Sequence, residues 1–129
     1  MKNYIPGSKD DPEAISNLKN RSFEEVKQDI PTLLEWIQDL HWDVAHDICD
    51  WLIPHINKIT NELLYIINTN DEEWKFNILI RLIAKSPHQL APELLSVIKK
   101  IAENPTHREA LEEVNIVAKK IIIENDKKL

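Results

Sequence analysis

A twenty-residue segment of this chain recurs thirty residues later, and this repeat limits the fold more than any other feature of the sequence. LLEWIQDLHWDVAHDICDWL begins at Leu33, and LLYIINTNDEEWKFNILIRL begins at Leu63. The two segments are both apolar at five equivalent positions, namely Leu33/Leu63, Leu34/Leu64, Ile37/Ile67, Ile48/Ile78 and Leu52/Leu82. Stacked helical units need this pattern, because each unit buries a similar face while its outside is unconstrained. The repeat predicts an all-α fold, an α-α superhelix of stacked antiparallel helix hairpins.

Amino-acid usage agrees with a helical protein. A single glycine among 129 residues disfavours β-hairpin turns and nucleotide-binding loops, both of which use glycine heavily. A single cysteine excludes an internal disulfide and suits a reducing compartment. Apolar runs fall well short of the roughly 20 residues of a membrane span, and the N-terminus lacks an apolar signal core. We therefore expect a soluble, cytoplasmic protein without membrane contact.

Capping residues and prolines divide the chain into helices. Ser22 with Glu25, and Thr106 with Glu109, have the spacing of capping boxes, and Pro12 suits the first turn of a helix. We expect one helical-repeat domain over residues 1–129. It comprises N-terminal capping helices in 1–30, helix hairpins at 31–54, 55–85 and 88–124, and a frayed tail at 125–129.

The segments LLEWIQDLHWDVA, DEEWKFNILIRLI and ENPTHREALEEV resemble the bacterial domain of unknown function 5071. The resemblance extends from about Tyr4 to Ile123. Because that family is similar to the HEAT-like α-α superhelical proteins, the resemblance implies a HEAT-like repeat fold. It implies no activity and no functional residues.

The net charge of −6 indicates the kind of partner. Nucleic-acid backbones are bound by basic patches, so nucleic acid and a DNA-handling solenoid are disfavoured, whereas an acidic surface speeds encounter with basic proteins. Apolar residues in the last helix, Ile116 and Ile121 to Ile123, exceed the needs of one buried stripe and would suit a homodimer.

The sharpest chemical cluster in the sequence runs from His41 to Asp50. Four of its members lie at positions i, i+3, i+4 and i+7 and share one helix face, namely Asp43, His46, Asp47 and Asp50. Imidazole and carboxylate groups are ligands for divalent metals, which leaves a metal-binding sensor or enzyme as the alternative function. A solvated face opposite the apolar stripe is the favoured interpretation, so no metal site and no cofactor is predicted.

The remaining reactive or bulky residues fit structural roles. We expect Cys49 to be a buried thiol rather than a nucleophile, since no glycine-built elbow presents it. Trp36, Trp51 and Trp74 are expected in the core, whereas Trp42 lies in a turn and is the candidate for an exposed anchor. We predict no catalytic residue and no enzymatic activity.

The sequence therefore favours a non-catalytic protein–protein interaction module with a basic protein partner. An immunity-type inhibitor of a basic toxin is a specific version of this hypothesis and rests on analogy. The second helices of the hairpins and their turns are expected to present the binding residues Trp42, Asp43, His46, Asp47, Asp50, Glu72, Glu73, Asn77 and Arg81.

Overall fold

The structure, a computed structural model, describes residues 2–128 as helices and turns without a strand. The α-helices are α1 (Pro12–Lys19), α2 (Phe23–Val26), α3 (Ile30–Glu35), α4 (Asp43–Leu52), α5 (Thr60–Ile67), α6 (Glu72–Asn77), α7 (Pro92–Glu103), α8 (His107–Leu111) and α9 (Val114–Asp126). Short 3-10 segments extend or join them: η1 (Lys27–Asp29), η2 (Trp36–Gln38), η3 (Ile53–Lys58) and η5 (Ile83–Lys85), and η4 (Ile78–Leu82) is a π-helical stretch. The prediction of an all-α chain is confirmed. Within residues 2–128, every helix is too short or too polar to cross a membrane.

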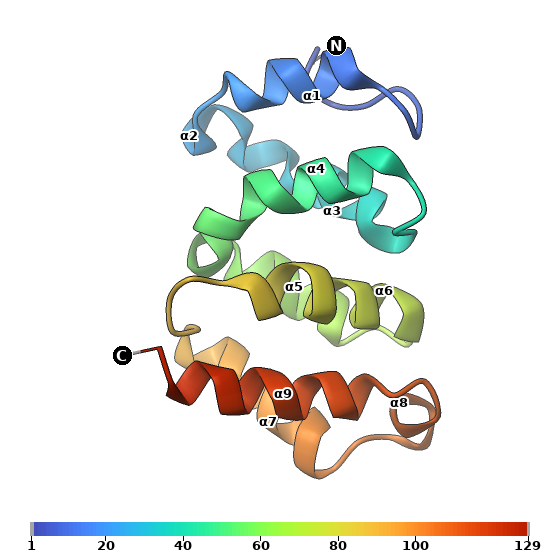
Figure 1. Cartoon of the computed structure of the whole chain (residues 1–129), viewed down its shortest axis with the longest axis vertical. Coiled ribbons are helices and arrows are strands. Elements are labelled where there is room, and N and C mark those ends of the chain that lie inside the picture. The colour runs from blue at the N-terminus through green and yellow to red at the C-terminus, as the bar shows by residue number, and fades with distance from the viewer. Residues whose placement is uncertain (1, 129) are drawn as a thin grey trace.

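The helices lie in successive layers from the N-terminus to the C-terminus (Figure 1). The first layer contains α1 and α2, the second α3 and α4, the third α5 and α6, and the last α7 and α9. Contacts between α1 and α4, α4 and η4, α5 and α7, and α6 and α9 join one layer to the next. Each layer therefore packs mainly on its neighbours in the chain.

The repeated apolar positions form the core of the two middle layers. Nine of the ten matched side chains are buried, and Leu64 is half-buried. Burial of apolar surface is the main favourable term in folding, so equivalent positions are apolar in both units. The periodic signal that predicted the helices also identified the core.

Two helix boundaries differ from the sequence-based expectation. The apolar spacing that follows Pro31 predicts a helix that ends near His41, but α3 ends at Glu35 and η2 at Gln38. The Asp39 carboxylate accepts a hydrogen bond from the His41 backbone N–H at 2.9 Å, a local turn that competes with helix continuation.

The predicted tail at 125–129 overlaps the last helix, which ends at Asp126. Asn125 belongs to α9 and is buried, and its side-chain oxygen accepts a hydrogen bond from the Leu90 backbone N–H at 2.8 Å. Leu129 lies outside the described residues.

Side chains of α6 donate hydrogen bonds to carbonyl groups near the end of α3 and η2. The last carbonyls of a helix have no partner within the helix. The Trp74 indole N–H donates to the Leu34 carbonyl at 3.1 Å, and the Asn77 amide donates to the carbonyls of Ile37 at 3.0 Å and Gln38 at 3.1 Å. The third layer therefore caps the helix end of the second.

A buried ion cluster joins α6 to α8. The Lys75 ammonium donates to Glu72 at 3.0 Å and to Glu109 at 3.1 Å, and all three side chains are buried. Burial alone would raise the pKa of the Glu109 carboxyl, but hydrogen bonds from the Thr106 backbone and from Lys75 outweigh it, so this pKa lies below its usual value. Such a pair is costly to break, because the remaining charge stays buried without a partner.

The Asn77 cap can be tested by removing its amide. We expect Asn77→Ala to lower the free energy of unfolding by about 2 kcal/mol, since the buried Ile37 carbonyl and the partly buried Gln38 carbonyl lose their donor. Asn70→Ala removes the same group from an exposed turn residue and should change stability by less than about 0.5 kcal/mol. Urea unfolding followed by tryptophan fluorescence measures both. Equal effects of the two substitutions would contradict the capping role.

The Glu109 carboxyl should make stability depend on pH. Its pKa is lowered in the folded state, so its contribution is complete above the unfolded-state pKa of about 4.3 and is lost as pH falls through the folded-state pKa. We expect Glu109→Gln to be less stable than the parent chain at pH 7, and this difference should shrink below about pH 4. Urea midpoints across this range measure it, with exposed Glu112→Gln as the matched control. A pH-independent difference would be inconsistent with the lowered pKa.

Candidate functional site

Helix α4 carries the predicted His/Asp cluster on the side that meets η4. Asp43 and Asp50 are exposed, whereas His46 and Asp47 are half-buried. Arg81 of η4 reaches across to α4, and its guanidinium donates to His46 Nδ1 at 3.0 Å, to the His46 carbonyl at 3.3 Å and to Asp50 at 2.8 Å. Asp43, His46, Asp47, Asp50 and Arg81 together are called the α4 face below.

The hydrogen bonds of the α4 face leave little room for metal coordination. His46 Nε2 lies 2.7 Å from the Leu40 carbonyl, so both ring nitrogens of His46 are engaged. The His41 ring lies 2.9 Å from Asp39 and not against the α4 carboxylates. Over residues 2–128, no three His, Cys, Asp or Glu side chains converge as metal ligands would.

Two of the predicted binding residues are buried. Glu72 is buried by its ion pair with Lys75, and Asn77 is buried where it caps η2. Both were expected at the surface as part of the ridge formed by the second helices of the hairpins and their turns. Glu73, the other acidic residue in the first turn of α6, is exposed as expected.

The tryptophans lie at the edges of the core rather than at its centre. All four are half-buried, and all pack against the core cluster. Trp42 contacts Trp36 edge to face, with ring centroids 5.5 Å apart and planes at 68°. Trp42 is thus partly exposed and held by an aromatic neighbour, whereas the other three are more exposed than the core location predicted for them.

Cys49 is buried in α4 next to the core residue Ile48. Burial raises the pKa of the Cys49 thiol to about 12. Since the thiolate is the nucleophile, this cysteine is inert near neutral pH. Its burial agrees with the structural role expected from the sequence.

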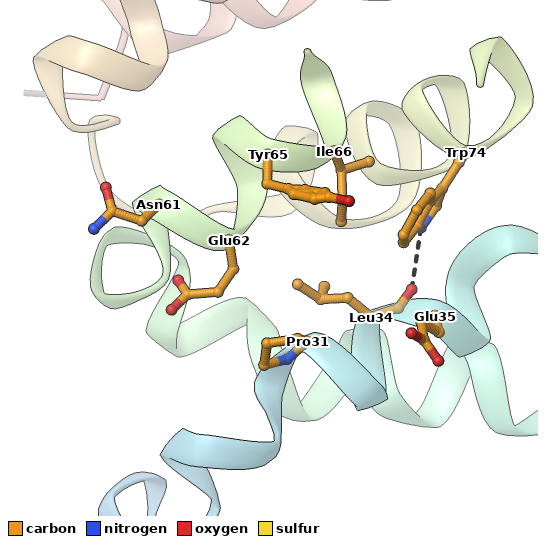
Figure 2. A pocket seen from close by; sticks show the side chains of 8 residues that line it. All are labelled: Pro31, Leu34, Glu35, Asn61, Glu62, Tyr65, Ile66 and Trp74. Atoms are coloured by element: carbon orange, nitrogen blue, oxygen red, sulfur yellow. Dashed lines mark hydrogen bonds between the residues drawn. The ribbon is translucent and has the colours of Figure 1, made fainter. Parts of the chain in front are cut away.

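A groove of about 420 Å³ lies between α3 and α5 and is closed at one end by the first turn of α6 (Figure 2). Pro31 and Leu34 of α3 face Tyr65 and Ile66 of α5, and the Trp74 ring forms the end wall. This volume falls within the range of about 300–1,000 Å³ typical of ligand pockets. The groove is therefore large enough to receive a side chain from another molecule.

Polar groups lie at the two ends of the groove. Glu62 and Asn61 are at one end, and Glu35 is at the other beside Trp74 (Figure 2). Neither carboxylate forms an ion pair within residues 2–128. The groove thus has an apolar centre between two acidic ends.

Sequence reasoning missed this groove, although one signal was present. Tyr65 falls between the buried residues Leu63 and Ile66 in an apolar run, and it lies off the stripe that faces the core. An aromatic residue at such a position is expected to be exposed, and Tyr65 is 66% exposed. The groove also depends on α3 and α5 lying near each other, and the sequence pattern does not specify which helices are neighbours.

Comparison with known proteins gives a family and no activity. A family model described as "Domain of unknown function (DUF5071)" matches residues 4–122. No curated protein matches the chain. The match covers both the α4 face and the groove.

Because Cys49 is buried, its thiol should react slowly with thiol reagents. We expect a thiol reagent such as dithiobisnitrobenzoate to modify the folded protein only as fast as the structure opens, and the unfolded protein at once in guanidinium chloride. The chain has one cysteine, so absorbance of the released thiolate reports this residue alone. Immediate stoichiometric modification without denaturant would show that the thiol is accessible.

Proposed function

The chain belongs to the DUF5071 family, and we propose that it is a non-catalytic protein–protein interaction module that binds a basic protein through the α4 face. In this proposal the stacked layers act as a HEAT-like superhelix in the bacterial cytoplasm. In this proposal Trp42, which precedes α4, and Glu73, in the first turn of α6, extend the surface offered to the partner.

Uncompensated negative charge on a fixed helix is the observation that carries this proposal. Arg81 pairs with Asp50, whereas Asp43 and Asp47 form no ion pair within residues 2–128. A surface with surplus carboxylates attracts basic partners and accelerates their association. The α4 face therefore favours a partner with clustered Lys or Arg.

The packing of α4 supports the same proposal by reducing the cost of binding. Val44, Ile48 and Leu52 are buried on the inner side of the helix, and the Arg81 guanidinium holds its outer side through three hydrogen bonds. Side chains that are already ordered lose less entropy when a partner docks. His46, Asp50 and Arg81 of the α4 face are thus held in place before a partner arrives.

The chemistry of the chain supports a binding role over catalysis. Cys49 has a raised thiol pKa, and both ring nitrogens of His46 are in hydrogen bonds. No observation favours the metal-dependent sensor or enzyme that the sequence left open. A specific form of the proposal is an immunity-type inhibitor, in which the α4 face covers the basic surface of a toxin.

Charge reversal on the α4 face tests the proposal. We expect immobilised parent chain to capture a basic protein from the native cytoplasm, and the Asp43→Lys/Asp47→Lys variant to lose it, because the substitutions replace attraction by repulsion. The matched control is Glu103→Lys/Asp126→Lys, which makes the same change in net charge at exposed residues of α7 and α9. Quantitative mass spectrometry compares the three captures, after circular dichroism has established that each variant is folded.

The Glu103→Lys/Asp126→Lys control separates the loss of the α4 face from a general effect of net charge. Retention of the partner by the α7/α9 control and loss by the α4 variant would support the proposal. Equal capture by all three chains, or equal loss from both variants, would eliminate the α4 face as the binding surface.

A further inference from the structure

The groove between α3 and α5 has rigid apolar walls. Leu34 and Ile66 are almost fully buried beneath it, and Pro31 has a fixed ring geometry. The Trp74 ring is held in place because its indole N–H donates to the Leu34 carbonyl (Figure 2). These walls are preformed, so a ligand would not have to open the groove.

Tyr65 is an exposed aromatic residue beside this groove. Its ring lies along the α5 wall, and 66% of its surface is exposed (Figure 2). Aromatic side chains bury a large surface at low entropic cost and are enriched among residues that dominate binding energies. Tyr65 is well placed to cover an apolar side chain that enters the groove.

The charges at the groove restrict its occupant. Glu62 lies at one end and Glu35 at the other, and the apolar centre lies between them (Figure 2). An apolar ligand without charge would leave both carboxylates without a counter-charge, and an acidic ligand would be repelled. The arrangement is complementary to an apolar group with a cation on either side.

We propose that the α3–α5 groove is a second binding site, and that it receives a segment of a partner protein in which one large apolar residue is flanked by Lys or Arg on both sides. The apolar side chain packs against Leu34, Ile66 and Tyr65. The flanking cations pair with Glu35 and Glu62, and the Asn61 amide at the Glu62 end offers hydrogen bonds to the backbone of the segment.

This site is separate from the α4 face. Its lining residues come from α3, α5 and the first turn of α6, and none belongs to α4 or η4. Substitutions in one site therefore leave the other intact, and the two proposals fail independently.

A peptide titration observed by NMR tests the groove directly. The probe is a synthetic peptide with a central leucine and two lysines on each side, added to the full chain. We expect it to shift the Trp74 indole N–H and Ile66 methyl resonances in a saturable manner. Two matched peptides, with serine in place of leucine or with glutamates in place of the lysines, should leave these resonances unchanged.

Protein variants assign the site. Glu35→Gln/Glu62→Gln should weaken peptide binding by about tenfold, which is the contribution of two exposed ion pairs. In the Asp43→Lys/Asp47→Lys variant, the leucine peptide should shift the Trp74 and Ile66 resonances as it does in the parent chain, because neither substituted residue lines the groove.

Three results would overturn the proposal. The first is the absence of shifts with the leucine peptide at millimolar concentration. The second is equal shifts with the serine or glutamate peptide. The third is movement of the Trp74 and Ile66 resonances with protein concentration alone, which would assign the groove to a second copy of this chain.

Discussion

The capping of one layer by side chains of the next is the constraint on which the rest of this structure depends. Helix α3 contains six residues and continues into the three-residue 3-10 segment η2, and the last carbonyls of such a helical stretch have no partner within it. Apolar stacking alone would leave the Ile37 and Gln38 carbonyls at the end of η2 without the donors that Asn77 supplies. Trp74 and Asn77 supply the missing donors from the following layer, and buried polar groups are tolerated only when paired in this way.

The same devices that hold the layers together also shape both candidate surfaces. The indole that caps Leu34 is the end wall of the α3–α5 groove. Arg81, which joins η4 to α4, leaves two carboxylates of α4 without a counter-charge. The shapes of the groove and of the α4 face therefore follow from how the layers pack. The contacts that shape both surfaces are present without a partner.

The sequence predicted the features that depend on local patterns. Apolar periodicity located the middle-layer core, and the capping boxes at Ser22 and Thr106 are both present as predicted. The sequence did not predict the burial of Glu72 and Asn77. Glu72 pairs with Lys75, which also binds Glu109 of a later helix, and Asn77 binds the Ile37 carbonyl 40 residues earlier in the chain. The sequence pattern of a helix does not distinguish a polar residue that faces solvent from one that donates a hydrogen bond to a carbonyl in the neighbouring layer. For the same reason the groove was missed, because it arises where α3, α5 and α6 meet.

Hydrogen exchange at the Trp74 indole N–H is the most direct test of layer-to-layer capping. The bond to the Leu34 carbonyl is one of the hydrogen bonds that join the second layer to the third, and it should open only when these layers separate. The account predicts that this proton exchanges with the same free energy of opening as the backbone amides of buried core residues such as Ile78 and Leu79. Exchange as fast as that of a solvent-exposed tryptophan would contradict it, and the Trp74 indole would then make no lasting contribution to holding these layers together.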